Sequence, residues 1–138
     1  MRILVIDDET YVREALERVL KSPSITVIGA ADAAAGFTAM RVAAVDLVII
    51  DVILPGMDGV TAIKRLRREY PDVRIIAMSG GGNFGLAAYR PEAISTGAYL
   101  AACSAAGANG TLAKPFETAE LRSLMNKCLG ESEGAQRT

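Results

Sequence analysis

The sequence predicts an α/β protein in which five strands alternate with five helices and form one open, doubly wound parallel sheet. Two observations lead to this prediction. The apolar runs expected to form strands are nearly continuous, as in Asp46–Ile50, which is typical of parallel strands covered on both faces. The segments between them space their apolar residues at the 3.6-residue period of a helix. Right-handed crossovers then place helices on both faces of the sheet.

The first part of the chain has the pattern strand, helix, strand, helix. Arg2–Ile6 is a short apolar run that ends at acidic residues and predicts a buried strand. Glu9–Lys21 repeats apolar residues along one helical face, and a Ser-Pro-Ser sequence ends this helix. Ile25–Ala30 is rich in β-branched residues and predicts the second strand. Asp32–Ala43 predicts the second helix, with its first residue as the N-cap.

The central part of the chain contains the most strand-like stretch. Asp46–Ile50 is bounded by aspartates and is the predicted third strand, and Pro55–Gly59 then has the composition of a turn. A helix is predicted from this turn to about Tyr70, followed by a fourth strand over Val73–Met78. The glycine-rich segment Gly80–Pro91 predicts a loop.

The last part of the chain predicts one more strand between two helices. An alanine-rich helix over Ala93–Ala106 ends at Gly107, and the fifth strand follows over Gly110–Ala113. Glu117–Leu129 carries apolar residues on one face and predicts the final helix. We therefore expect one domain over residues 1–129 and a flexible C-terminal tail over residues 130–138, which are small and polar.

The composition indicates one globular domain and argues against several classes of protein. The chain has 138 residues, of which 51% are hydrophobic and 22% charged, as in ordinary globular domains. Its net charge is −1 and it has no basic block, which argues against a nucleic-acid partner. No apolar run approaches the roughly 20 residues that cross a bilayer, and no signal peptide is recognisable, so we expect a cytoplasmic protein without a membrane partner. Cys103 and Cys128 fit that compartment as buried, reduced thiols.

Polar residues follow the predicted strands that lie around the centre of the sheet. Asp7 and Asp8 follow the first strand, and Asp51 follows the third. Ser79 follows the fourth strand, and Lys114 follows the fifth. Each residue alone also suits an ordinary cap, turn or surface charge. In a doubly wound sheet, however, ligands bind beyond the carboxyl ends of the strands, where all five of these residues are expected to meet.

A cluster of three carboxylates requires positive charge nearby. Two unit charges about 4 Å apart repel by about 4 kcal/mol at an effective dielectric constant of about 20. Lys114 supplies one positive charge, and a hard divalent cation such as Mg²⁺ is expected to supply the rest. A metal ion, a lysine and a carboxylate nucleophile together suit phosphoryl transfer.

With this arrangement the sequence resembles the receiver domains of two-component response regulators, of which the chemotaxis type is the simplest. The resemblance rests on Asp7-Asp8, on Asp51 followed by Pro55–Gly59, on Ser79 and on Lys114-Pro115-Phe116. It covers residues 1 to about 129 and implies a flavodoxin-like sheet with the strand order 2-1-3-4-5. Because no output domain follows in the sequence, it also implies a stand-alone regulator.

The resemblance implies a magnesium site formed by the acidic residues. Asp8, Asp51 and the backbone carbonyl of Ile53 are the expected direct ligands. Asp7 is expected to act through a bound water molecule.

The resemblance also implies the residues that handle the phosphoryl group. Asp51 is the expected phosphoacceptor, and Lys114 is expected to pair with a phosphoryl oxygen. Ser79 is the expected switch hydroxyl. The peptide bond before Pro115 is expected to be cis.

Two features depart from the family pattern. Thr111 occupies the position three residues before the lysine, where the family commonly has an aromatic residue that couples to the switch hydroxyl. The segment between Ser79 and Lys114 is longer than usual, and the extra length lies in Gly80–Pro91. This insert is either a tolerated loop or a lid that orders on phosphorylation.

The predicted function is a signalling switch rather than an enzyme that turns over a substrate. Asp51 would accept its phosphoryl group from a sensor histidine kinase or a histidine phosphotransfer protein, because the chain itself contains no histidine. The downstream protein is unknown, and a homodimer formed on phosphorylation stays an open alternative.

Three other functions stay possible at this point. One is a degenerate receiver that binds partners without phosphorylation. Another is an aspartyl-nucleophile phosphatase of the haloacid dehalogenase type, which has an Asp-x-Asp where this chain has adjacent Asp7 and Asp8. The third is a flavodoxin-like cofactor binder, whose phosphate end the three acids would repel.

Overall fold

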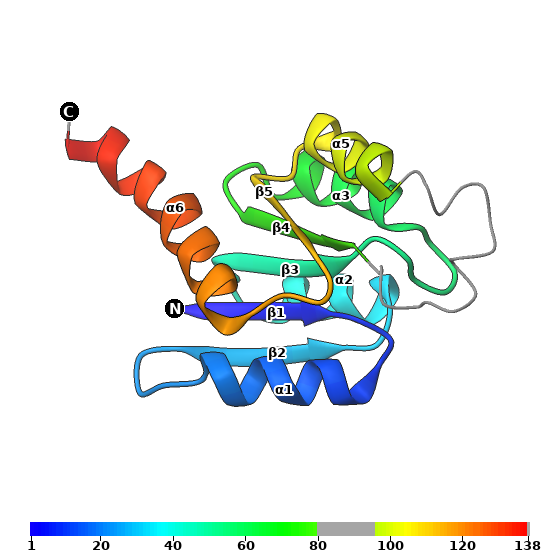
Figure 1. The fold of residues 1–138 in the computed structure, drawn as a ribbon, viewed down its shortest axis with the longest axis horizontal. Helices are drawn as coiled ribbons and strands as arrows, with labels where there is room; N and C mark the ends of the chain where they lie inside the picture. The colour runs from blue at the N-terminus through cyan, green and yellow to red at the C-terminus, as the bar shows by residue number, and fades with distance from the viewer. Residues whose placement is uncertain (80–95, 138) are drawn as a thin grey trace.

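Five parallel strands form the centre of the molecule (Figure 1). The computed structural model describes residues 1–79 and 96–137. Its strands are β1 (Arg2–Ile6), β2 (Thr26–Ala30), β3 (Leu47–Asp51), β4 (Arg74–Ser79) and β5 (Gly110–Ala113). They pair in parallel in the order β2-β1-β3-β4-β5. The predicted doubly wound sheet and its strand order are therefore confirmed.

Helices cover both faces of this sheet. They are α1 (Thr10–Leu20), α2 (Ala33–Val42), α3 (Gly59–Glu69), α5 (Thr96–Ala106) and α6 (Thr118–Arg137). On one face, α2, α3 and α5 pack on a core that includes Val48 and Ile50. On the other face, α1 and α6 pack on a core that includes Leu47 and Ile49. Successive residues of β3 thus enter opposite cores, which explains why this strand is apolar throughout rather than alternating.

Aspartate caps set the starts of two helices near the site. The side chain of Asp32 accepts a hydrogen bond from the backbone N–H of Ala35 at the start of α2, as predicted for an N-cap. Asp58 caps α3 in the same way, accepting from the backbone N–H and the hydroxyl of Thr61. This hydrogen bonding lowers the pKa of Asp58.

The largest difference from the sequence-based boundaries is at the C-terminus. We expected the last helix to end at Leu129, whereas α6 continues to Arg137 and projects beyond the sheet (Figure 1). The residues after Leu129 include no proline, and Gly130 costs a helix only about 1 kcal/mol relative to alanine. The division into a domain over 1–129 and a flexible tail over 130–138 stays a prediction. The predicted loop Gly80–Pro91 lies outside the described residues.

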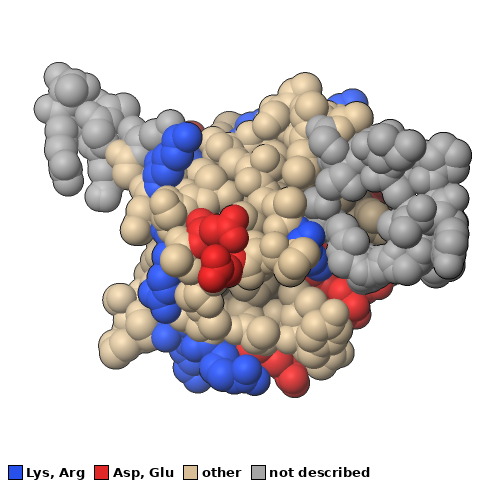
Figure 2. All heavy atoms as spheres, viewed as in Figure 1, with Lys and Arg blue, Asp and Glu red and all other residues tan. Residues whose placement is uncertain are grey.

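The described surface mixes charges of both signs. On the face shown in Figure 2, acidic and basic side chains are interspersed among neutral ones. Within residues 1–79 and 96–137, no helix is both long and apolar enough to span a membrane.

Candidate functional site

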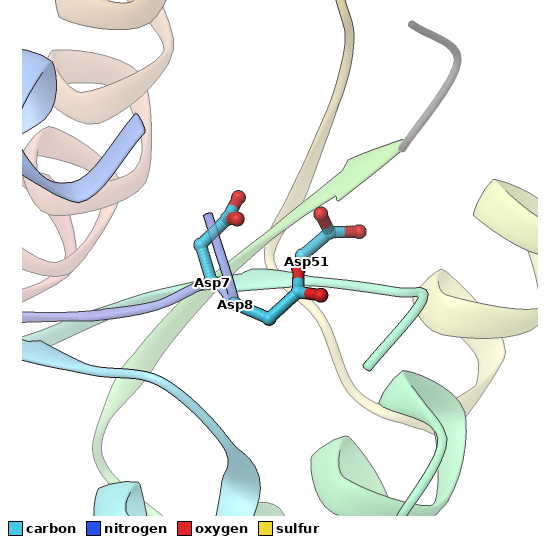
Figure 3. A group of neighbouring side chains, drawn as sticks. All are labelled: Asp7, Asp8 and Asp51. Atoms are coloured by element: carbon cyan, nitrogen blue, oxygen red, sulfur yellow. The ribbon is translucent and has the colours of Figure 1, made fainter. Parts of the chain in front are cut away.

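The carboxyl ends of β1 and β3 bring three aspartates together (Figure 3). Ile6 of β1 lies opposite Ile50 of β3, so the residues that follow these positions are neighbours. Asp7 and Asp8 follow β1, and Asp51 is the last residue of β3. One carboxylate oxygen from each aspartate lies within 4.8 Å of the other two. The structure thus assembles the acidic cluster that the strand ends predicted.

Asp7 is fully buried, and both of its carboxylate oxygens are occupied within the protein. Oδ1 accepts a 2.9 Å hydrogen bond from the backbone N–H of Glu9. Oδ2 accepts a 2.9 Å hydrogen bond from the ammonium of Lys114. The side chain is therefore oriented before any ligand binds.

Lys114 follows β5, and its ammonium lies between two buried aspartates. Nζ is 2.9 Å from Oδ2 of Asp7 and 3.0 Å from Oδ2 of Asp51. Burial alone would lower the pKa of Lys114, but the hydrogen bond to Asp7 and the charge of Asp51 outweigh it and raise this pKa. The lysine is therefore charged in neutral solution. The peptide bond between Lys114 and Pro115 is cis, as the resemblance implied.

Asp51, the last residue of β3, is buried, with 3% of its surface exposed. Its Oδ1 accepts a 2.9 Å hydrogen bond from the backbone N–H of Ile53, and its Oδ2 faces Lys114. Burial raises the pKa of Asp51 to about 6, although both hydrogen bonds oppose the rise. The neighbouring charge of Asp7 adds to the rise. One ammonium thus compensates the cluster only in part, which favours the binding of a further cation.

Asp8 differs from the other two aspartates because it is exposed. Within the described part of the chain its carboxylate accepts no hydrogen bond and forms no ion pair. Its oxygens are therefore available to a ligand, beside the carboxylate of Asp51 (Figure 3). Carboxylate oxygens are the ligands that Mg²⁺ and Ca²⁺ prefer.

The turn after β3 is held by a close backbone contact. The backbone N–H of Gly59 donates to the carbonyl of Val52, and the N–H of Val52 donates to the carbonyl of Met78 in β4. A Cβ atom at Gly59 would lie 2.4 Å from Cα of Val52. Only glycine lets α3 begin this close to the residue that follows Asp51.

The remaining predicted residues lie at the same edge. Ser79 is the last residue of β4 and pairs with Ala113, directly before Lys114, but its side chain is outside the described part. Ile53 is 55% exposed, and its backbone N–H donates a hydrogen bond to Asp51. Thr111 is half-buried in β5, opposite Ala77.

Two contacts to the site were not predicted from the sequence. Glu9 Oε1 lies 3.9 Å from Lys114 Nζ and adds a third carboxylate near the ammonium, after Asp7 and Asp51. Arg13 donates a 2.7 Å hydrogen bond to the main-chain carbonyl of Asp7. The acid directly after Asp7-Asp8 could have indicated Glu9. The contact of Arg13 with a main-chain carbonyl leaves no comparable pattern in the sequence, because every residue has a carbonyl.

The raised pKa of Asp51 predicts that the metal-free protein loses stability as the pH rises from about 4 to 7. In this window the folded protein holds a proton on Asp51 that the unfolded chain, with a pKa near 3.8, has released. Folding therefore becomes less favourable with rising pH, by at most about 3 kcal/mol for a shift of about two units. Asp51→Asn should be more stable than the unchanged protein at pH 7, and the difference should shrink towards pH 4. Urea unfolding in EDTA at several pH values measures this, and a pH-independent difference would contradict it.

The comparison with protein families identifies the chain. The model of the response regulator receiver domain matches residues 3–126, which include every residue of the site described above. The chain therefore belongs to the response regulator receiver domain family.

Curated relatives contain a similar segment within longer proteins. The transcriptional regulatory protein FixJ of Bradyrhizobium diazoefficiens is 30% identical over 136 residues, which cover 99% of this chain and 60% of FixJ. The sensor kinase CckA of Brucella abortus is 30% identical over 136 residues, 95% of this chain and 13% of the kinase. The protein-glutamate methylesterase/protein-glutamine glutaminase 5 of Anaeromyxobacter dehalogenans is 43% identical over 81 residues, 57% of this chain and 22% of that protein. The chain thus spans less than two thirds of each of these relatives.

Solved receiver structures share the whole fold. The signal receiver domain of an HD domain-containing protein from Pseudomonas fluorescens Pf-5 superposes with a TM-score of 0.78 at 25% identity, covering 99% of this chain and 91% of that domain. The Vibrio cholerae chemotaxis protein CheY4 superposes with a TM-score of 0.71 at 26% identity, covering 92% of this chain and 97% of that protein.

Proposed function

We propose that this protein is a phosphoacceptor switch in which Asp51 takes up a phosphoryl group in a Mg²⁺-dependent reaction. The observation that supports this proposal best is the arrangement around Asp51. Its carboxylate is buried beside an exposed acid, Asp8, and contacts the ammonium of Lys114 at 3.0 Å. A nucleophilic carboxylate, a fixed cation and an open acidic position are the parts that phosphoryl transfer requires.

The donor set fits a hard divalent cation. Asp8 and Asp51 would hold Mg²⁺ with the backbone carbonyl of Ile53, while the fully buried Asp7 would act through a water molecule. When bound, the ion would neutralise negative charge on the phosphoryl oxygens.

The reaction follows from the contacts of Asp51 and Lys114. A carboxylate oxygen of Asp51 forms a bond to phosphorus while the bond from phosphorus to the ring nitrogen of a phosphohistidine breaks, and that nitrogen keeps the electron pair. Lys114 then exchanges its contact with Asp51 for a phosphoryl oxygen. Its second contact, to Asp7, keeps the ammonium in place during this exchange.

The proposed partners follow from this chemistry. This chain has no histidine, so the phosphohistidine lies outside it, on a sensor histidine kinase or a histidine phosphotransfer protein. We expect the protein to act in the cytoplasm and to signal to a downstream protein through a conformational change. Ser79, at the end of β4, would sense the phosphoryl group. Thr111 would replace the usual aromatic partner of that hydroxyl.

Phosphoryl uptake from a small acyl phosphate tests the proposal. We expect intact-protein mass spectrometry to detect one phosphoryl group on the unchanged protein with Mg²⁺, and none in EDTA or in Asp51→Asn. Asp72→Asn, which changes an exposed aspartate in the turn before β4, should be labelled like the unchanged protein. Folded protein that is not labelled would contradict the proposal and favour a receiver that binds partners without phosphorylation.

A further inference from the structure

Arg13 contacts the backbone of the acidic cluster rather than a carboxylate. Its Nη1 donates a 2.7 Å hydrogen bond to the main-chain carbonyl of Asp7, and its Nη2 donates a 3.2 Å hydrogen bond to Oγ1 of Thr10. α1 begins at Thr10, and the N-cap residue Glu9 makes no side-chain capping bond. The guanidinium of Arg13 therefore ties the first turn of α1 to the end of β1.

The carbonyl that Arg13 holds belongs to the peptide unit directly before Asp8. This unit is planar, so fixing its carbonyl also fixes the direction in which the chain enters Asp8. The N–H of Asp7 is held on the other side by the carbonyl of Ala30, at 3.0 Å. The Asp8 carboxylate itself has no hydrogen-bond or ion-pair partner among the described residues. Its position near Asp51 (Figure 3) is therefore set by the backbone that Arg13 anchors.

The neighbouring strand leaves room for the Arg13 side chain. Gly29 lies in β2, next to the end of β1. A Cβ atom at Gly29 would lie 3.2 Å from Cδ of Arg13, closer than an ordinary contact. The absence of a side chain at this glycine lets the stem of Arg13 lie flat on β2 and direct the guanidinium at the Asp7 carbonyl.

We propose that Arg13 is a positioning residue of the metal site, which orients Asp8 towards the cation shared with Asp51 by holding the carbonyl of Asp7. The inference rests on the proposed function, because it requires that the acidic cluster binds Mg²⁺. Arg13 does not touch the cation or the phosphoryl group. Groups that orient metal ligands in this way typically change metal affinity by about 10-fold to 100-fold when they are removed.

The Mg²⁺ dissociation constant, measured by titration calorimetry, tests this role directly. Arg13→Met keeps the apolar stem but removes every donor, and should weaken Mg²⁺ binding about 10-fold. Arg13→Lys can still donate to the Asp7 carbonyl and should recover most of the affinity. Arg18→Met removes the same charge from an exposed position of α1 and should bind Mg²⁺ as the unchanged protein does.

Labelling with acyl phosphate separates positioning from a general structural effect. In Arg13→Met the Mg²⁺ concentration for half-maximal labelling should rise by the same factor as the dissociation constant, while the rate at saturating Mg²⁺ stays close to that of the unchanged protein. Thermal melting in EDTA checks that the variant is folded. If it is not, Arg13→Leu, which also has no side-chain donor, takes its place with the same expected weakening.

Three results would overturn the inference while the proposed function stands. The first is that Arg13→Met binds Mg²⁺ as tightly as the unchanged protein. The second is that Arg18→Met weakens Mg²⁺ binding as much as Arg13→Met does, and the third is that Arg13→Lys recovers none of the lost affinity. Failure of the proposed function has a different signature, because the unchanged protein itself would then neither bind Mg²⁺ nor take up a phosphoryl group.

Discussion

Replacing Lys114 by methionine should lower the free energy of unfolding by about 3–5 kcal/mol at neutral pH without metal. The ammonium lies 2.9 Å from Asp7 and 3.0 Å from Asp51, and both aspartates are almost fully buried. Without it, two buried carboxylates face each other with no counter-charge, and they must either stay charged at low dielectric or take up protons. Methionine is about as long as the apolar part of the lysine side chain, so the decrease in the free energy of unfolding is due to the missing charge rather than to a cavity.

Urea unfolding in EDTA measures this loss. Lys64→Met, on the exposed face of α3, removes the same charge away from the site and should change stability by no more than about 0.5 kcal/mol. Added Mg²⁺ should reduce the loss in Lys114→Met, because the ion supplies positive charge to the same oxygens. Lower pH should also reduce it, because protonated carboxyls no longer repel. Equal losses in Lys114→Met and Lys64→Met would show that the buried ion pairs do not stabilise the fold.

Gly59→Ala should lower the free energy of unfolding by about 3 kcal/mol, the upper end of the usual cost of overpacking, and should also impair phosphoryl uptake. The added Cβ would lie 2.4 Å from Cα, 2.8 Å from the carbonyl oxygen and 2.9 Å from the carbonyl carbon of Val52. These are backbone atoms and cannot rotate away as a side chain could. Because Val52 directly follows Asp51, any shift that relieves the overlap displaces the turn beside the acceptor carboxylate.

The matched control for this substitution is Gly130→Ala, also within a helix. Apart from the backbone of its own helix, no atom in the described part of the chain lies within 4 Å of a Cβ added at Gly130 in α6, so the gain in helix propensity acts alone. The free energy of unfolding of this variant should rise by up to about 1 kcal/mol. Comparing the two variants by urea unfolding and by labelling separates the steric effect from helix propensity. A stable Gly59→Ala protein that is labelled normally would show that the turn after β3 can relax.

Much of the fold could be predicted because its signals are local. The run Leu47–Ile50 is apolar at every position, and this pattern is sufficient to predict a strand buried on both faces. The aspartates after β1 and β3 could be assigned to one site because parallel strands end at one edge of the sheet. The predicted end of the last helix at Leu129 was wrong, because a polar composition does not exclude a helix when no proline or cap stops it.

Contacts to the backbone could not be predicted in the same way. Arg13 binds the carbonyl of Asp7, and every residue has a carbonyl, so no residue type marks the acceptor. Glu9 lies 3.9 Å from Lys114 only because folding brings the residue after β5 to the residues after β1, which are far apart in the sequence.

The sequence by itself determined the order of strands and helices and which acids, lysine and serine stand at the strand ends, because these depend on periodicity and on the side-chain chemistry of neighbouring residues. Only the tertiary structure decided that Lys114 bridges Asp7 and Asp51, that Asp8 is left exposed and without a partner in the described part, and that burial raises the pKa of Asp51. These properties depend on how completely the surrounding strands and helices exclude water from each carboxylate. That exclusion exists only once segments distant in the sequence have packed together.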